Sequence, residues 1–396
     1  MEIDFIIGPK TDRIFGMSKY QNEIFKRITG VKFNIIEYNS LTYLFERKYK
    51  SIFPYKNNSS PNSPSNKAVP QKTIKHVVFN RTINTGKNIS DNIDRYRYSN
   101  LIKRKTTKDN IKHITSQQLA YLLNSLKLDK TIITCYDLIP WAYENNRSSF
   151  WKNNIKGLKK ADRIITISEF SKSELIKYVK YPEDKIDIVY PAVNHDTYYR
   201  TGDRNILKQL NIPENCKVIL YVGSEEPRQN VDVLIKAFGE LKKKLPEVKL
   251  IKIGNPHLHG AREKLLELIE KLNIQKDIVF LDFVPEEELP QWYNAADLMV
   301  YPCSYAGFGM PPLEAMACGT PVITSNVTSL PEVVGEAGIM VDPHDIHDLS
   351  TNMYEILIND DLMEDMSIKG LKRAKMFNWD KSAQKTVEIY EKMQTY

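Results

Sequence analysis

Short apolar runs of the kind that form buried strands alternate with helical patterns, and the whole alternation occurs twice along this chain. The first half contains IDFIIG, FNIIEY, IKHI, TIITCYDL and RIITIS, and the second half contains KVILYVG, KLIKIG, DIVFLDFV, LMVYP and PVITS. Segments with helical spacing of apolar residues, such as VDVLIKAFGELKKKL and AREKLLELIEKLNI, lie between them. This alternation is typical of parallel sheets covered by helices. The sequence therefore predicts an α/β protein built from two doubly wound domains.

The expected domain boundary lies where the second series of strands begins. A chain of 396 residues is long enough for two domains of ordinary size. The segment YPAVNHDTYYRTGDRN separates the two series, so we expect a first domain over residues 1–195 and a second over residues 204–378. The last helical pattern, residues 379–396, follows the second series, and we expect it to pack back onto the first domain.

The apolar runs and the cysteines indicate the cellular compartment in which the protein works. No apolar run approaches the roughly 18 residues that span a bilayer, and the opening MEIDFIIGPK reads as a first strand instead of a signal peptide. Cys135, Cys216, Cys303 and Cys318 form no CxxC pair, which fits a reduced cytosol and buried thiols. We therefore expect a cytoplasmic protein, and a peripheral position on the inner face of a membrane stays open.

Charge is divided unevenly between the two halves of the chain. Residues 1–200 hold 35 Lys and Arg against 19 Asp and Glu, whereas residues 201–396 hold 21 against 30. A basic half beside an acidic half suggests an anionic partner for the first half only.

Two basic segments of the first half, residues 41–56 and 95–112, are the candidates for that contact. The first of them places apolar and aromatic residues four apart with Arg and Lys between them. A helix that packs on its own sheet and a helix that lies on an anionic membrane surface both fit this pattern. No pattern of an RNA- or DNA-binding module is present, so we do not expect a nucleic acid partner.

The stretch YAGFGMPPLEAMACG carries the strongest indication of a ligand site. A strand ends at Pro302, a glycine-containing loop follows, and Pro311 and Pro312 indicate a helix start. Glycines let a ligand approach the backbone, and a helix N-terminus presents free N–H groups to an anion. With this start, Glu314 falls in the first helical turn. Two roles for it stay open: capping the turn, or accepting hydrogen bonds from the ribose hydroxyls of a nucleotide.

The wider pattern resembles one known family. The second half, from KVILYVGSEEPRQNVDVLIKAF through the stretch above to FNWDKSAQKTVEIYEKM, resembles the GT4 family of retaining glycosyltransferases throughout. The first half adds IFGMSKYQNEIFKRI, ADRIITISEFSKSELIKYV and EDKIDIVYPAVNHDTY, which are similar to the family's first loop and its crossover. The resemblance implies a GT-B fold, in which two facing Rossmann-like domains enclose a cleft. It also implies that the second domain binds a sugar nucleotide and the first binds the acceptor.

Three places depart from the family's pattern. The family's paired acids are spaced as E-x7-E, but here Ala306 stands in the first position and only Glu314 remains. The family's phosphate loop usually supplies an Arg and a Lys, where this chain has Ser224 and Gln229. A histidine that the family often carries is replaced by Tyr136.

The resemblance also implies roles for individual residues. Arg228, the backbone N–H groups of residues 307–310 and the helix dipole would stabilise the departing diphosphate without a metal or a cofactor. Tyr136 would either donate a hydrogen bond to a substrate or only pack at the strand end, and Asp137 would orient its loop or act as a helper base. The expected catalytic residues are Tyr136, Asp137 and Arg228, and the expected donor site comprises Gly16, Ser224, Arg228, Gln229, Ala306, Gly307, Phe308, Gly309, Met310 and Glu314.

Two functions follow from these observations. The first is an active retaining transferase that moves a hexose, with mannose as the first candidate, from a nucleotide sugar to a lipid-linked or polysaccharide acceptor at the cytoplasmic face of a membrane. The second is a degenerate relative that binds a nucleotide sugar or a partner without turnover. A nicotinamide-dependent oxidoreductase is not expected, because no G-x-G-x-x-G stands at a first strand–helix turn.

Overall fold

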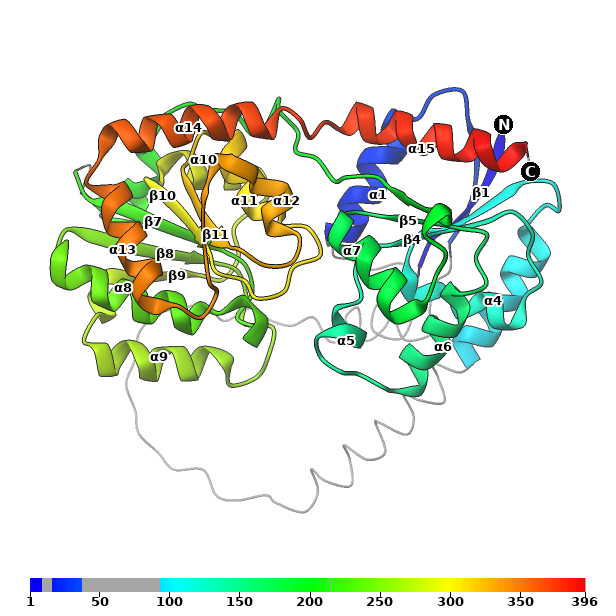
Figure 1. Ribbon diagram of the computed structural model, residues 1–396, viewed down its shortest axis with the longest axis horizontal. Helices are drawn as coiled ribbons and strands as arrows, with labels where there is room; N and C mark the ends of the chain where they lie inside the picture. Colours follow the sequence, from blue (N-terminus) through cyan, green and yellow to red (C-terminus); the bar gives the residue numbers. More distant parts are fainter. Residues whose placement is uncertain (9–15, 38–92, 214, 396) are drawn as a thin grey trace, which may run out of the picture.

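The computed structural model describes residues 1–8, 16–37, 93–213 and 215–395. These residues form two α/β domains, each with a six-stranded parallel sheet between helices (Figure 1). The predicted fold class is confirmed. The basic segment 41–56 lies outside the described residues, whereas the segment 95–112 lies within them.

The first domain has the strand order β2-β1-β3-β4-β5-β6, and each neighbouring pair is parallel. Its strands are β1 (Glu2–Ile6), β2 (Lys32–Ile36), β3 (Ile111–Ile114), β4 (Thr131–Cys135), β5 (Arg163–Thr166) and β6 (Ile186–Ile188). Its helices are α1 (Gly16–Arg27), residues 93–105, α4 (Leu122–Ser125), α5 (Ile139–Ala142), α6 (Ser149–Leu158) and α7 (Glu169–Glu174). Every residue of β3 and β4 is buried, including the polar residues Lys112 and His113 of β3.

The second domain has the strand order β12-β11-β10-β7-β8-β9, also parallel throughout. Its strands are β7 (Lys217–Val222), β8 (Val248–Ile253), β9 (Ile278–Leu281), β10 (Leu298–Tyr301), β11 (Val322–Ser325) and β12 (Ile339–Val341). Its helices are α8 (Val231–Lys244), α9 (Ala261–Leu272), α10 (Leu289–Ala295), α11 (Met310–Ala317), α12 (Leu330–Val334), α13 (Ile346–Leu357) and α14 (Asp360–Ala374).

The strand order of each sheet reverses at one point, between β1 and β3 in the first domain and between β7 and β10 in the second. Open α/β sheets bind ligands at the carboxyl ends of the strands beside such a reversal. In the first domain, helix α1 follows β1 at this place. In the second domain, the loops after β7 and β10 lie there, and they contain most of the residues that the sequence predicts to bind the donor.

The last helix, α15 (Trp379–Gln394), leaves the second domain and lies against α1 of the first (Figure 1). The Ser382 hydroxyl donates a hydrogen bond of 2.7 Å to the carbonyl of Tyr190. Deeper in the first domain, His113 of β3 lies between two hydroxyls. Its Nδ1 is 2.6 Å from the Tyr390 hydroxyl of α15, and its Nε2 is 2.8 Å from the Thr134 hydroxyl of β4. The chain therefore crosses between the domains twice.

The burial of His113 allows a prediction of how the free energy of unfolding changes in acid. Burial lowers its pKa from 6.5 to about 3, so the folded protein keeps the ring neutral where the unfolded chain protonates it. The stability that depends on neutral His113 is present above pH 6.5 and is lost as the pH falls from there towards 3. By pH 4.5 we expect the wild type to lose about 2–3 kcal/mol more than a His113→Gln variant, relative to each protein at pH 8.

Urea denaturation of both proteins between pH 8 and 4.5 measures this difference. His347→Gln is the control, since the side chain of His347 is 82% exposed. Parallel pH profiles for the wild type and His113→Gln would show that His113 is not the group that titrates.

Candidate active site

The loop after β10 is held in place by contacts with residues 329 and 330 at the start of helix α12. The Ser329 hydroxyl donates to the carbonyls of Ala306 and Phe308, at 2.9 and 2.6 Å. Gly309 immediately precedes helix α11 and has a φ of 118°, a backbone conformation that residues with a side chain rarely adopt. A Cβ at this position would also lie 2.7 Å from Leu330. Helix α11 starts at Met310, and Pro311 and Pro312, which follow, have no N–H group. The backbone N–H groups near this helix start are therefore those of residues 307–310.

Glu314 lies in the second turn of α11, because the helix already begins at Met310. The predicted position in the first turn is wrong, and Glu314 does not cap the helix. Its side chain is 9% exposed, its Oε2 accepts a 2.9 Å hydrogen bond from the Tyr293 hydroxyl, and its Oε1 lies 3.6 Å from Lys19 Nζ of the first domain. Burial raises the pKa of Glu314, and the positive charge of Lys19 opposes that rise.

The loop after β7 is tied to the loop after β10. The Ser304 amide donates to the carbonyl of Arg228 at 2.7 Å, and the Arg228 guanidinium donates to the carbonyl of Tyr305 at 3.2 Å. The same guanidinium forms a 2.6 Å ion pair with Glu226. Arg228 therefore lies against residues 304 and 305 of the loop after β10.

The Gln229 side chain lies in the interior of the second domain, whereas Ser224 is half-buried. Gln229 is 4% exposed, and its Oε1 accepts a 3.1 Å hydrogen bond from the Tyr221 hydroxyl. The same hydroxyl lies 3.0 Å from the carbonyl of Ser224. The structure thus places no positive charge at 229 and gives the Gln229 side chain a buried partner.

A buried cluster of ion pairs in the second domain supports the loop after β7. Glu225 Oε1 accepts from Lys252 of β8 and from Arg262 Nε of α9, each at 2.7 Å, and the side chains of Glu225 and Lys252 are 0% and 1% exposed. Arg262 also pairs with Asp282 at 2.8 Å. Since Glu225 precedes Arg228 by three residues, the cluster fixes the loop that carries Arg228.

Tyr136 and Asp137 follow β4 on the opposite side, in the first domain. The Tyr136 hydroxyl accepts a 2.8 Å hydrogen bond from Gln21 of α1, and its ring packs edge-on against Tyr20. Asp137 Oδ1 accepts a 3.1 Å bond from the Ile139 amide, which starts helix α5, and burial raises the pKa of Asp137.

The two sides touch each other at Gly307. A Cβ on Gly307 would lie 3.0 Å from the Asp137 Cβ and 3.2 Å from the carbonyl of Tyr136. The Ser168 hydroxyl, just before helix α7, donates a 2.7 Å bond to the Gly307 carbonyl. The structure therefore brings Asp137, Arg228, Gly307 and the start of α11 together, in a conformation in which the domains are closed on each other.

Further contacts hold the domains closed around this point. Glu332 of α12 accepts hydrogen bonds from the amides of Glu169 and Phe170, at 2.8 and 3.1 Å, and so caps helix α7 from the other domain. The Tyr305 hydroxyl donates to Glu174 at the end of α7. Burial raises the pKa of Glu174 to about 7.

The remaining predicted donor residues fall into two groups. Ala306 and Phe308 are buried; the Ala306 amide donates to the Thr328 hydroxyl at 3.3 Å, and the Phe308 ring packs on Phe377. Gly16 is the first residue of α1, and the loop before it lies outside the described residues. Sequence reasoning missed Lys19, Tyr293, Ser168 and Glu332. Only Lys19 carries a signal, since it follows the predicted Gly16 by one helical turn.

The described residues contain neither a cluster that could bind a metal ion nor a helix that could span a membrane. In the part of the chain that the structure describes, no three His, Cys, Asp or Glu side chains gather so that they could hold a metal ion. Within the same residues, no helix combines the length and the apolar character that crossing a bilayer requires.

Two Rossmann-like domains that face each other are the architecture of the GT-B fold. The family models for glycosyl transferases group 1 and for glycosyltransferase family 4 match residues 203–373 and 62–197. The chain belongs to the GT4 family of glycosyltransferases.

Relatives and solved structures agree with this assignment. O-antigen chain mannosyltransferase B of Escherichia coli is 34% identical over 272 residues, which cover 67% of this chain and 71% of that protein. The serotype-specific mannosyltransferase WbdA of the same species is 30% identical over 67% of this chain, and the match spans 34% of WbdA. Sucrose-phosphate synthase of Thermosynechococcus elongatus has the same fold, with a TM-score of 0.74 at 20% identity over 99% of this chain and 98% of that one. Anabaena Alr3699/HepE, solved in complex with UDP and glucose, gives 0.72 at 15% over 98% and 99%.

Proposed function

We propose that this protein is an active retaining glycosyltransferase. It transfers a hexose, with mannose as the first candidate, from a nucleotide sugar to a lipid-linked or polysaccharide acceptor at the cytoplasmic face of a membrane. The observation that carries the proposal is the contact of Gly307, in the loop between β10 and α11, with Asp137 of the other domain, while Glu314 of α11 reaches Lys19 of that domain. The mannosyltransferase relatives support the choice of sugar, and the UDP complex of a structural neighbour supports a nucleotide donor.

In this proposal the donor lies along the second domain. Its diphosphate meets the backbone N–H groups of residues 307–310, just before and at the start of α11, and the guanidinium of Arg228. Its ribose hydroxyls donate to the Glu314 carboxylate, which Tyr293 already orients. The hexose points towards Gly307 and the Asp137 wall.

The reaction breaks the bond between the sugar's anomeric carbon and the diphosphate oxygen. Negative charge grows on the departing diphosphate, and Arg228 and the backbone N–H groups of residues 307–310 stabilise it; one preorganised donor of this kind contributes about 3–4 kcal/mol to such a step. The acceptor hydroxyl attacks from the same face, and its proton passes to the leaving phosphate. The proposal needs no metal and no further cofactor. The hydrogen bond from Gln21 to Tyr136 supports a packing role for Tyr136, and Asp137 orients its loop.

The close contact between Gly307 and Asp137 also implies motion. The two walls are already within van der Waals reach, so the domains must separate to admit a sugar. They then close again over the bound donor and exclude water from the leaving group.

A panel of UDP-, GDP- and ADP-linked hexoses with lipid-phosphate and oligosaccharide acceptors tests the proposal. We expect transfer from one donor with retention of the anomeric configuration, which NMR of the product reports. A folded protein that turns over no donor would overturn it.

Ala306 and Gln229 favour a second candidate function. Both side chains are buried and uncharged at places where the family's pattern has polar groups. The second candidate is a relative that binds a nucleotide sugar without turnover and acts as a partner of another protein. Calorimetric binding of a nucleotide sugar in the same panel, with no product, is the result that would favour it.

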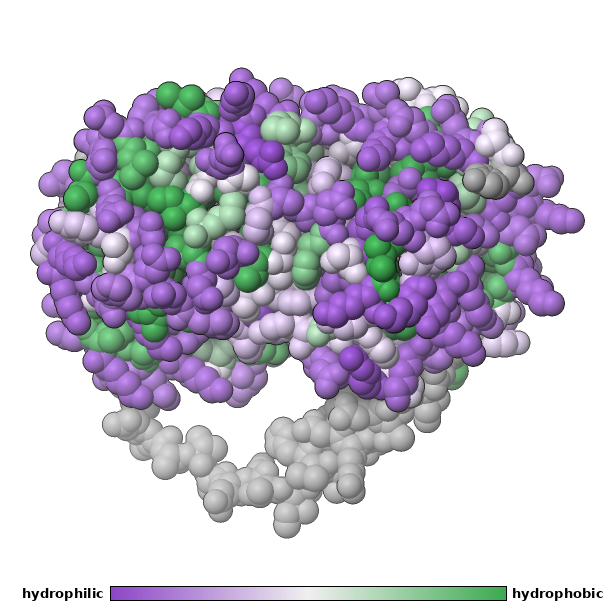
Figure 2. Space-filling view, viewed as in Figure 1, coloured by the Kyte–Doolittle hydropathy of each residue, from purple (hydrophilic) through white to green (hydrophobic). Residues whose placement is uncertain are grey.

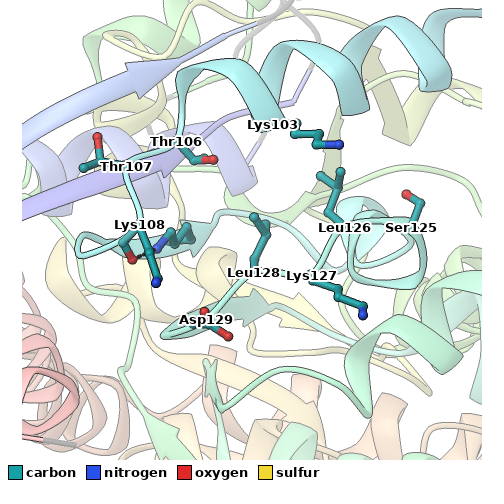
Figure 3. Close-up of a pocket in the computed structure, with 10 residues that line it drawn as sticks. Lys103, Thr106, Thr107, Lys108, Ser125, Leu126, Lys127, Leu128 and Asp129 are labelled. Atoms are coloured by element: carbon teal, nitrogen blue, oxygen red, sulfur yellow. Dashed lines mark hydrogen bonds between the residues drawn. The ribbon is translucent and has the colours of Figure 1, made fainter.

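The membrane contact is proposed for the described basic segment 95–112. Its helix and the turn after it form one wall of an open pocket of about 530 Å³, and the loop before β4 forms the other wall (Figure 3). The ionisable side chains around the pocket are Lys103, Lys108, Lys112, Lys127 and Asp129. This excess of lysine favours contact with anionic lipid headgroups. On the face of the molecule that Figure 2 shows, most of the surface is hydrophilic.

Charge reversal on this wall is expected to weaken membrane binding. A basic residue near an anionic surface contributes about 1 kcal/mol, so Lys103→Glu with Lys127→Glu should lower vesicle binding by roughly 10-fold or more. Co-sedimentation with vesicles of neutral lipid and 30% anionic lipid measures it. Lys264→Glu together with Lys236→Glu on the second domain changes the net charge equally, and equal loss by this control would contradict the assignment of the surface.

A further inference from the structure

Only one described side chain forms ion pairs that join the two domains. Lys19 Nζ of α1 lies 2.5 Å from Glu286 Oε1 and 3.6 Å from Glu314 Oε1, and both carboxylates belong to the second domain. Its ammonium also lies 5.4 Å from the centre of the Tyr198 ring. The other ion pairs among the described residues lie within one domain or involve the crossing segment at Arg200. Lys19 is thus the cation that the first domain extends across the interface.

The second domain lacks positive charge where the proposed function requires it. Gln229 is buried against Tyr221, and the guanidinium of Arg228 already faces Glu226. A donor diphosphate carries negative charge on each phosphate, and the pair of Arg228 and Glu226 is neutral. A second cation must therefore come from elsewhere.

Lys19 is placed to supply that cation. It lies in the first turn of α1, beside the point where the strand order of the first sheet reverses. The N–H groups at the N-terminus of α1 favour an anion at this end of the helix. Burial opposes the charged ammonium, but Glu314 and Glu286 outweigh burial and raise the pKa of Lys19. The side chain is therefore charged at neutral pH, and its long stem lets it change partners.

Tyr198 provides a further indication that this cluster receives a ligand. Its side chain is buried beside Lys19, and its hydroxyl has no hydrogen-bond partner among the described residues. A buried hydroxyl without a partner costs free energy. A bound ligand with a polar group within reach would remove that cost.

We propose that Lys19 is the cation that replaces the family's missing lysine: it pairs with Glu286 and Glu314 in the empty enzyme and turns to the donor's diphosphate when a nucleotide sugar binds. This inference rests on the proposed function. The exchange leaves the Glu314 carboxylate available to the ribose hydroxyls. The same movement removes the ion pairs that join the empty domains, so donor binding and domain position are coupled through one side chain.

The test distinguishes the contribution of the phosphates to binding from the contribution of the nucleoside. UDP and GDP are titrated by calorimetry, and uridine and guanosine by ligand-observed NMR, into the wild type, Lys19→Ala and Lys19→Arg. We expect Lys19→Ala to weaken the preferred diphosphate roughly 10- to 100-fold and to leave the nucleoside within about 3-fold. Lys19→Arg keeps the charge and should retain most of the affinity. Lys26→Ala on the same helix is the control, because its side chain is 68% exposed.

Each other result has a definite meaning. Equal weakening of diphosphate and nucleoside would show that Lys19 only supports the fold of the site. Tighter binding of both would show that Lys19 only competes for Glu314. Either result overturns the inference and leaves the proposed function standing, whereas a folded wild type that binds neither diphosphate and turns over no donor of the panel would remove the proposed function itself.

Discussion

Replacing Glu314 by alanine is expected to reduce the affinity for a nucleoside diphosphate by roughly 100-fold or more, because two hydrogen bonds to a carboxylate are lost. The change also leaves the buried Tyr293 hydroxyl without its partner. Since the ribose is common to both ligands, the nucleoside should lose affinity by a similar factor. Lys19→Ala is expected to leave the affinity for the nucleoside nearly unchanged. Nucleoside binding therefore distinguishes the role of Glu314 from that of Lys19.

Calorimetry with Glu286→Ala as the matched control tests this prediction. Glu286 pairs with the same lysine, but its side chain is 54% exposed, so we expect a change of less than about 3-fold. Unchanged affinity in a folded Glu314→Ala protein would place the ribose elsewhere and would remove the basis for the proposed donor position.

Replacing Glu225 by glutamine is expected to cost about 3–5 kcal/mol of stability, because it leaves the buried ammonium of Lys252 without a counter-charge. Lys252→Met should cost less, since Glu225 keeps its 2.7 Å bond from Arg262 Nε. The double variant Glu225→Gln with Lys252→Met should recover much of the loss, because the uncompensated charge is gone. Donor affinity should fall with Glu225→Gln as well, since the loop that carries Arg228 loses its support.

Urea denaturation of the single and double variants provides the comparison. The surface pair of Lys369 and Asp365, whose side chains are 54% and 52% exposed, gives the control; Asp365→Asn should change stability by less than about 1 kcal/mol. If Glu225→Gln were no worse than this surface change, the buried pair would not be what fixes the loop.

The fold could be predicted from the sequence because its central strands are buried. Strand β10 is apolar at every position, and β4 has only threonines besides its apolar residues, so each gives a run that is distinct from the helical patterns around it. The strands β6 and β12 escaped prediction. Each has three residues and lies at the edge of its sheet, so neither needs a long apolar run.

The site could be predicted only in part. Local motifs identified the loops that hold Arg228 and Gly309, because the residues that define a turn or a helix start are neighbours in sequence. They could not show that Gln229 points towards Tyr221, since its direction depends on the packing behind the loop. They also could not pair Lys19 with Glu314, because the fold alone brings together residues so far apart in the chain.

The two crossings between the domains determine how the enzyme can open. They lie against each other: the carbonyl of Phe377 in the second crossing is 3.2 Å from His195 Nε2 in the first, and the Tyr190 and Phe377 rings pack edge-on. Two chain segments joined at one place act as a single pivot. We expect the opening that the proposed function requires to take place about this pivot, so that displacement grows with distance from it and both sheets stay intact.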